Sequence, residues 1–342
     1  MEVLWFCLVA IMIAGYVVLD GFDFGVGMLH LFVARNDAER RQVLGSIGPV
    51  WDGNEVWLLA GGGTLYFAFP SLYSSAFSGF YLALMIVLWL LILRGIAIEF
   101  RNHIDSNVWR PFWDTVFCGA SAVLALVFGV ALGNVVRGVP LDDSGFFFVP
   151  LWVNLSVGHE TGIIDWYTLL VGLTAFAALA LHGSLWIALK TTGAVYERAT
   201  RMASTVAWPV ALLTLVITWF SFLIQPNLGA QFGANPWGFV FPAIALAGLI
   251  AAFVLNRRGS NLGAFAGSSA FLVGMLCSAA FGVFPYVLPS NGKASAGLTI
   301  YNAAAAHYGL VVGLWWWIPG MLLAAGYSIF TYRQLAGRVQ AE

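Results

Sequence analysis

The sequence has 342 residues, of which 61 % are hydrophobic and only 9 % are charged. Soluble domains usually contain about 25 % charged residues, so this composition excludes an ordinary soluble enzyme. The net charge of −1 and the scattered arginines also exclude a nucleic-acid-binding surface. Between Met202 and Asn256 there is no Asp, Glu, Lys, Arg or His, which predicts several membrane spans joined by uncharged turns.

Nine apolar segments are long enough to cross a bilayer, which takes roughly 20 mainly apolar residues. Phe69-Pro70-Ser71 predicts a tight turn, and the Pro, Gly and Asn residues from Gln225 to Pro236 predict a loop. No stretch is polar enough for a separate soluble domain, so residues 1–342 are expected to form one all-α transmembrane domain. The predicted helices span residues 4–33, 49–70, 73–98, 114–136, 166–189, 203–224, 238–255, 260–284 and 308–332.

The basic residues predict the orientation, because Lys and Arg near membrane ends favour the cytoplasm. With nine helices, 13 of the 15 basic residues fall on one side, and only Arg137 and Lys293 fall on the other. We therefore expect an outside, periplasmic N-terminus and a cytoplasmic C-terminus. Tryptophans near the predicted helix ends are expected to anchor the chain at the membrane interface. They are Trp5, Trp166, Trp237, Trp315, Trp316 and Trp317.

Cysteines and histidines predict no cofactor site. The three cysteines, Cys7, Cys118 and Cys277, form no Cys-x-x-Cys pair and are interpreted as buried small hydrophobic residues. Haem needs axial ligands such as His, but only one histidine lies clearly inside a predicted span. For that residue, His182, a hydrogen bond between helices is the favoured interpretation. The others are His30, His103, His159 and His307.

Two carboxylates lie well inside the first predicted span. Asp20 and Asp23 are three residues apart and share one helix face. A single Asp at a helix centre costs about 3 kcal/mol on insertion scales, so both should face protein, water or an opposite charge. They are candidates for handling protons. Alternatively, they bond backbone loosened by nearby glycines, or pair with Arg94, without a catalytic role.

The second predicted span opens with another pair of acids, Asp52 and Glu55. Acids complement a helix N-terminus without further function, but these two lie close to the deeper pair and are candidates for cytoplasmic proton uptake. The glycines at 61–63 predict close helix packing. Arg94 and Glu99, at the end of the third span, are the candidate countercharges, although Arg94 can instead snorkel to the boundary.

Long strings of this sequence resemble cytochrome bd ubiquinol oxidase subunit II. The two longest are Leu19-Asp20-Gly21-Phe22-Asp23-Phe24-Gly25-Val26-Gly27-Met28-Leu29 and Gly48-Pro49-Val50-Trp51-Asp52-Gly53-Asn54-Glu55-Val56-Trp57-Leu58. Shorter matches are Ala68-Phe69-Pro70, Leu93-Arg94-Gly95, His182-Gly183 and the region from Phe284-Pro285 to Pro289-Ser290. The matches spread over most of the chain and are strongest in the first hundred residues.

The resemblance implies a multi-pass subunit of a terminal oxidase in the bacterial cytoplasmic (inner) membrane. Such an enzyme oxidises quinol, reduces O₂ to water and contributes to the proton gradient. The implied partner is subunit I, which carries the quinol site and the b-type and d-type haems, whereas subunit II normally binds no haem. The isolated chain is not expected to be active. A small accessory subunit, and a quinone or membrane lipid bound to this chain, are left open.

The resemblance also implies residue roles by position. Asp52 corresponds to a candidate for a cytoplasmic proton path, Asp23 to a deeper acid, and Trp57 to a residue near a proposed oxygen route. An ion-coupled secondary transporter is the alternative, because intramembrane acids and glycine-interrupted helices also describe such carriers. Against it, the second half of the chain has no repeat of the Asp20 or Asp52 motif. A subunit that ligates haem itself is a third alternative, which depends on the histidines.

Overall fold

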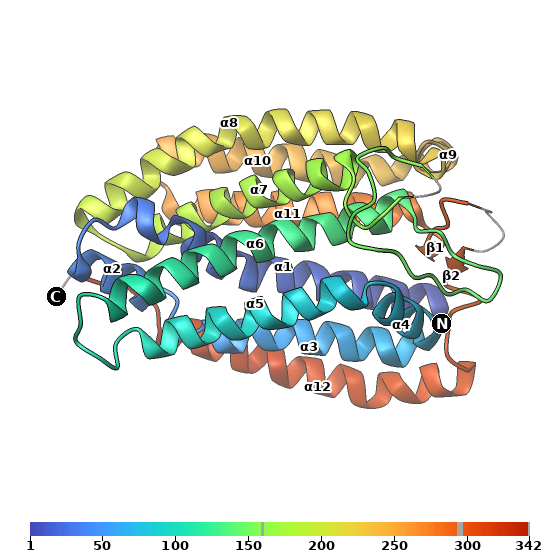
Figure 1. The fold of residues 1–342 in the computed structure, drawn as a ribbon, viewed down its shortest axis with the longest axis horizontal. Helices are drawn as coiled ribbons and strands as arrows, with labels where there is room; N and C mark the ends of the chain where they lie inside the picture. Colours follow the sequence, from blue (N-terminus) through green and yellow to red (C-terminus); the bar gives the residue numbers. More distant parts are fainter. Residues whose placement is uncertain (159–160, 293–296, 341–342) are drawn as a thin grey trace.

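The computed structural model describes residues 1–158, 161–292 and 297–340, and most of them are helical. Figure 1 shows the long helices packed lengthwise into one elongated bundle. This arrangement confirms the all-α fold that the hydropathy predicts. The long helices are α1 (Glu2–Val33), α3 (Trp51–Ala68), α5 (Tyr81–Phe100), α6 (Trp109–Arg137), α7 (Trp166–Lys190), α8 (Gly193–Ile224), α10 (Val240–Arg257), α11 (Asn261–Val283) and α12 (His307–Gln334).

Eight helices in the described part of the chain are long and apolar enough to cross a membrane. The exception among the nine predicted spans is α3, which begins with polar residues and contains three consecutive glycines. Nevertheless, α3 lies lengthwise in the bundle between α1 and α12, and the indole of Trp317 donates to the Thr64 hydroxyl at 3.3 Å. The count of nine spans and the orientation therefore stay predictions.

Two connections differ from those that the sequence predicts. The predicted third span is broken at Phe80, so that α4 (Pro70–Gly79) precedes α5. The predicted loop after Gln225 is wrong, because that segment forms α9 (Pro226–Ala234) and the one-turn helix η1 (Pro236–Phe239). Both short helices begin at a proline, which suits the first helical turn because its ring fixes φ and no N–H donor is needed there.

Several helices extend beyond their apolar stretches. The sequence places the start of one span at residue 203, whereas α8 begins at Gly193 and includes Arg198 in its polar first turns. Likewise, α6 begins five residues earlier than expected, at Trp109. A further short helix, α2 (Asp37–Gly45), follows α1 and lies at the end of the bundle where α12 also ends (Figure 1). Hydropathy detects the membrane-crossing part of a helix but not its polar continuation.

At the other end of the bundle, long connections cover the helix ends. A two-stranded antiparallel sheet, β1 (Tyr286–Leu288) with β2 (Leu298–Thr299), lies beside the connection between α6 and α7 (Figure 1). Buried Arg137 closes α6 at this end and forms an ion pair with Asp165, which caps α7. These contacts join the end of α6 to the start of α7.

Glycines bring α1 and α7 together at backbone distance. A Cβ atom at Gly25 would collide with the Leu179 carbonyl oxygen, and one at Gly183 would collide with the backbone of Gly25. Small residues at a helix crossing allow this approach in membranes. The crossing lies directly beside Asp20 and Asp23, so it fixes their turn of α1 in the centre of the bundle.

Two side-chain expectations are wrong. Trp5 is fully buried, and its indole N–H donates to the Leu310 carbonyl at 3.0 Å, so it joins α1 to α12 instead of anchoring the interface. Cys7 is exposed and Cys118 and Cys277 are only half-buried, although buried positions are expected for all three. Trp166, Trp237, Trp315 and Trp316 are exposed and Trp317 is half-buried, so the anchoring role of these residues stays a prediction.

Candidate functional site: a buried acid cluster

The centre of the candidate site is the turn of α1 that carries Asp20 and Asp23. Both side chains are buried, with at most 1 % of their surface exposed. Asp23 lies ten residues before the end of α1 at Val33, which is roughly 15 Å along the axis at 1.5 Å per residue. The two carboxyls are therefore deep in the bundle, as their positions in the first predicted span indicate.

Arg94 of α5 joins α1 to α3. Its Nη1 donates to Asp20 Oδ1 at 2.7 Å, and its Nη2 donates to Glu55 Oε2 at 3.0 Å. The guanidinium carbon also lies 4.3 Å from the centre of the Phe24 ring. Because Arg94 is fully buried, it acts as a countercharge within the bundle and does not snorkel to the boundary.

Asp23 has different neighbours. Its Oδ2 accepts a hydrogen bond from Asn54 Nδ2 at 2.8 Å, and Asn54 Oδ1 accepts one from the Tyr332 hydroxyl at 2.7 Å. Asp23 Oδ1 has no hydrogen-bond partner within the described ranges. One oxygen of this carboxyl is therefore fixed by an amide, while the other remains able to accept or release a proton.

The charges of the cluster do not balance if every group is ionised. Arg94 pairs with Asp20 and Glu55, while Asp23, three residues from Asp20, adds a third carboxyl that forms no ion pair with the described residues. When several carboxyl groups lie close together away from water, at least one tends to be protonated, because burial and mutual repulsion both oppose ionisation. Chemically, such a cluster can hold a proton inside an apolar bundle and release it when the surroundings change.

Three other candidate residues lie outside this hydrogen-bonded cluster. Asp52 is exposed on the first turn of α3 and forms no hydrogen bond or ion pair with the described residues. Glu99 is also exposed, and no contact with Arg94 is found in the described part of the chain. Trp57 is half-buried and packs against α1, where a Cβ at Gly15 would lie 3.6 Å from its ring.

A second charged cluster, absent from the sequence predictions, lies at the α2 end of the bundle. Buried Asp114 accepts hydrogen bonds from Arg101 Nε at 2.5 Å and from Arg40 Nη1 at 2.9 Å, and its Oδ1 lies 2.7 Å from His30 Nε2. Arg101 also bonds Asp37 Oδ1 at 2.8 Å. These contacts tie α1, α2, α5 and α6 together at one end.

Charge pairing shifts the acids of α2. Burial alone would raise the pKa of Asp37, but the hydrogen bond and charge of Arg101, aided by Arg110, hold that pKa below its ordinary value. For Glu39, the hydrogen bond from Arg198 at 2.5 Å lowers the pKa and outweighs the opposing effect of burial. Both carboxylates therefore stay ionised near neutral pH and act as structural partners for arginines.

Buried His182 does not fit a haem site, because it has no free ring nitrogen to ligate iron. Both ring nitrogens of buried His182 have partners, since Nδ1 lies 2.7 Å from the Ser268 hydroxyl and Nε2 lies 3.0 Å from the Val18 carbonyl. The predicted hydrogen bond between helices is confirmed. His103 and His307 are exposed, and His159 lies outside the described residues. Within those residues, no group of three His, Cys, Asp or Glu side chains is arranged to hold a metal ion.

Comparison with known proteins identifies the family. Residues 1–335 match the family described as cytochrome bd terminal oxidase subunit II. The chain belongs to this family. It is 30 % identical to the cytochrome bd-I ubiquinol oxidase subunit 2 of Escherichia coli, over 99 % of this chain and 95 % of that protein. It is 34 % identical to the cytochrome bd ubiquinol oxidase subunit 2 of Bacillus subtilis, over 90 % and 88 %.

Further similarities agree with this assignment. A probable cytochrome oxidase subunit 2 of Haemophilus influenzae is 32 % identical, over 99 % of this chain and 95 % of that protein. A chain in the structure of bd oxidase from Geobacillus thermodenitrificans superposes with a TM-score of 0.78, with 98 % of both chains covered. At 16 % identity, that likeness supports the fold alone.

Membership of the subunit II family makes this chain a multi-pass subunit of a bd-type terminal oxidase in the bacterial inner membrane. In this family the haems lie in the partner, subunit I. Nothing in these similarities supports the alternative of an ion-coupled secondary transporter.

Proposed function

We propose that this subunit II supports a haem-bearing subunit I during quinol oxidation and O₂ reduction, and that its buried acid cluster passes protons toward that reaction. Relatives named as ubiquinol oxidase subunits support quinol as the electron donor. The observation that carries the proton role is the deep burial of Asp20 and Asp23 beside the Arg94 guanidinium, which Asp20 shares with the partly exposed Glu55. O₂ reduction to water consumes protons, so a proton-holding group inside the bundle has a direct use.

The proposed path runs from the α2 end of the bundle toward its centre. Asp52 is exposed at the mouth of α3, and Glu55, one turn further along, still has 24 % of its side chain exposed. Glu55 shares Arg94 with Asp20, so a proton that reaches Glu55 alters the charge balance at Asp20 and Asp23. The path thus begins at an accessible acid and ends at a buried one.

Helix α3, which carries Asp52 and Glu55, is also the proposed contact with subunit I. Lipid tails cannot solvate a carboxylate, so exposed acids on a membrane helix must face water or another protein. Helix α3 exposes Asp52, part of Glu55 and the apolar Leu59 on the bundle surface. We propose that subunit I covers this face and that Trp57 lies beside the route by which oxygen reaches the haems.

Asp23→Asn tests the proton role, because the amide keeps the size and hydrogen bonding of the side chain but removes the ionisable group. The purified complex should keep its haem spectrum and quinol binding while turnover per haem falls by at least about tenfold, given the usual effect of a lost proton-transfer group. Asp52→Asn should lower turnover in the same way if protons pass Asp52 at the start of α3.

A control and an opposite outcome make this test decisive. Asp142→Asn changes an exposed acid in the connection between α6 and α7, far along the chain from the proposed path, and should leave turnover unchanged. Turnover per haem equal to wild type in Asp23→Asn would reject the proton role. Activity that falls only in proportion to the retained haem would instead show that these carboxyls act in packing.

A further inference from the structure

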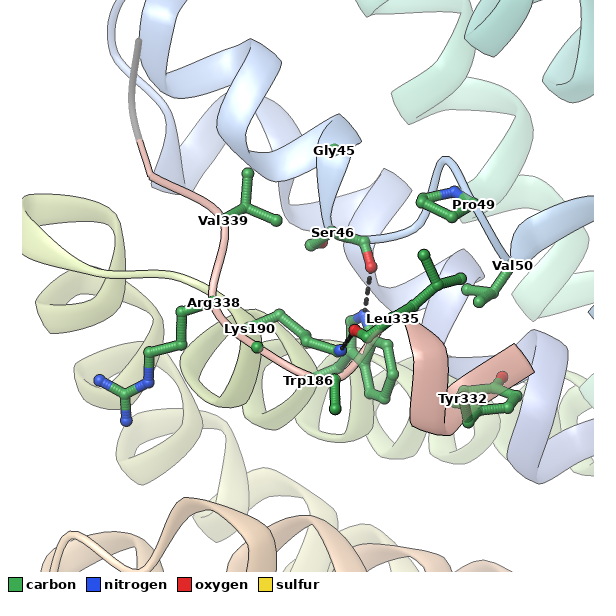
Figure 2. A pocket seen from close by; sticks show the side chains of 12 residues that line it. Gly45, Ser46, Pro49, Val50, Trp186, Lys190, Tyr332, Leu335, Arg338 and Val339 are labelled. Carbon is green, nitrogen blue, oxygen red and sulfur yellow. Dashed lines mark hydrogen bonds between the residues drawn. The ribbon is translucent and has the colours of Figure 1, made fainter. Parts of the chain in front are cut away.

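A pocket of about 210 Å³ opens at the α2 end of the bundle (Figure 2). Its walls come from Pro49 and Val50 just before α3, from Trp186 near the end of α7, and from Tyr332 near the end of α12. Residues 335–339, here called the C-terminal strap, form another part of the wall, together with Gly45 and Ser46 at the end of α2 and with Lys190. Residues 335–338 of the strap are exposed, so the pocket reaches the surface.

Three hydrogen bonds to the strap backbone hold it in place. Lys190 Nζ donates to the Leu335 carbonyl at 2.7 Å, and the Val339 N–H donates to the Lys190 carbonyl at 2.7 Å. Gln42 of α2 adds a hydrogen bond to the Val339 carbonyl at 2.8 Å. These bonds fix the strap to α2 and α7, so the pocket is part of the folded structure.

Tyr332 lies between this pocket and the buried acids. It lines the pocket, while its hydroxyl donates to Asn54 Oδ1 and Asn54 in turn donates to Asp23 Oδ2. An amide does not titrate, but its orientation matters to a carboxyl. With Nδ2 toward Asp23, the amide stabilises the ionised carboxylate; with Oδ1 toward it, the amide can accept a bond only from the protonated form.

We propose that Tyr332 is a positioning residue that locks the Asn54 amide and thereby sets the pH at which Asp23 releases its proton. The inference rests on the proposed proton role of the cluster. In this proposal the pocket, which opens at the α2 end of the bundle and is lined by Tyr332, admits water to that side of the cluster. The other charged or titratable groups around Asp23 are Asp20 of α1, Glu55 of α3 and Arg94 of α5.

Tyr332→Phe removes only the hydroxyl and leaves those charged groups in place. The amide is then free to turn Oδ1 toward a protonated Asp23, which favours the protonated form. In the purified complex, the profile of turnover per haem against pH should move about one unit toward higher pH, as expected for the loss of one hydrogen bond. The infrared carboxyl band that disappears in Asp23→Asn should titrate with the same shift.

Tyr327→Phe is the matched control, because Tyr327 is an exposed tyrosine on the same helix. Its turnover profile and carboxyl band should keep the wild-type positions. Tyr332→Phe with both readouts at the wild-type positions would overturn the proposal. If Asp23→Asn is inactive in that case, the proton role of the cluster stands and only the role of Tyr332 is rejected.

A second measurement tests the pocket without changing Tyr332. Ala336→Cys places a thiol on the strap, where a bulky charged thiol reagent applied to the complex should block the pocket. Labelling should lower turnover several-fold, whereas labelling of Gln340→Cys, on the same segment but outside the pocket wall, should not. Reagent-treated wild-type complex corrects for the native thiols. Full turnover after complete labelling of Ala336→Cys would reject access through the pocket.

Discussion

Arg94 is stable inside the bundle because its guanidinium is paired with carboxylates. Two acids on different helices share its guanidinium, and removing one partner of such a buried pair usually costs about 3–5 kcal/mol. Asp114 shows the opposite arrangement, in which one carboxylate serves two arginines and a histidine. The first cluster has more acids than bases, which supports its proposed proton role, whereas the second has more bases than acids and holds helix ends together.

Glu39 gives a pH-dependent prediction at the α2 end. Its pKa is lowered in the folded protein, mainly by the Arg198 hydrogen bond, so its stabilising effect is complete above the unfolded pKa of about 4.3. That effect is lost as the pH falls through the lower folded value. Glu39→Gln should therefore lower the melting temperature of the complex at pH 7, by an amount corresponding to at most about 1 kcal/mol.

The melting difference between Glu39→Gln and wild type should shrink as the pH falls below about 4, where the wild-type carboxylate becomes protonated. Scanning fluorimetry across pH measures it. Glu197→Gln, beside Arg198 but exposed, is the control and should match wild type throughout. A difference that stays constant down to pH 3 would mean that the Glu39 charge does not contribute to the contact.

At the scale of single residues, the sequence predicts positions better than partners. Asp20 and Asp23 could be placed on one face of one helix because their spacing is local. Arg94, 74 residues from Asp20, could be named as a partner because it is an arginine within an apolar segment, but the Asn54 and Tyr332 contacts could not be predicted. No local pattern distinguishes Tyr332 from the other tyrosines of its helix. Its hydrogen bond to Asn54 depends on how α12 packs against α3.

Among the elements, the crossing of α1 and α7 has the least freedom. Gly25→Ala should prevent the backbones from meeting, because its Cβ would strike the Leu179 carbonyl and Gly183. We expect much less assembled complex in the membrane, measured as haem recovered with the tagged subunit. Gly119→Ala, on α6 with no atom within 4 Å of the added Cβ, should assemble normally. Equal recovery of both variants would mean that α1 can shift without loss of the fold.

The elements also show what hydropathy can and cannot predict. Hydropathy predicts all eight apolar helices, because a helix that crosses a bilayer needs a long apolar stretch. It missed α2 and α9, which lie outside the predicted spans, and it began α8 ten residues late because the first turns of that helix are polar. Helix α3 shows the opposite difference, because it is as long as a span but the polar residues at its start, which belong to or adjoin the acid cluster, lower its hydropathy.

The molecule as a whole has apolar surfaces around a buried polar cluster. Large apolar side chains are exposed along α8 and α12, as expected for surfaces that lipid or subunit I covers. The acid cluster lies among α1, α3, α5 and α12, so the proposed proton path and the proposed partner surface on α3 belong to the same side of the bundle. A change in either is expected to affect the other.

The arrangement of α3 also decides the topology of the whole chain. Helix α1 begins at one end of the bundle and α12 finishes at the other (Figure 1). Nine spans put the termini on opposite sides of the membrane, whereas eight spans without α3 put them on the same side. The basic residues favour nine, with the C-terminus in the cytoplasm.

Reporters at three positions test this topology in intact cells. A reporter before Met1 and one inserted at Ser144, in the connection between α6 and α7, should both read outside, and one fused after Arg338 should read cytoplasmic. The path from Met1 to Ser144 crosses the membrane four times if α3 is a span and three times if it is not. Opposite readings at these two positions would therefore remove α3 from the membrane, and Asp52 would no longer stand at the mouth of a transmembrane helix.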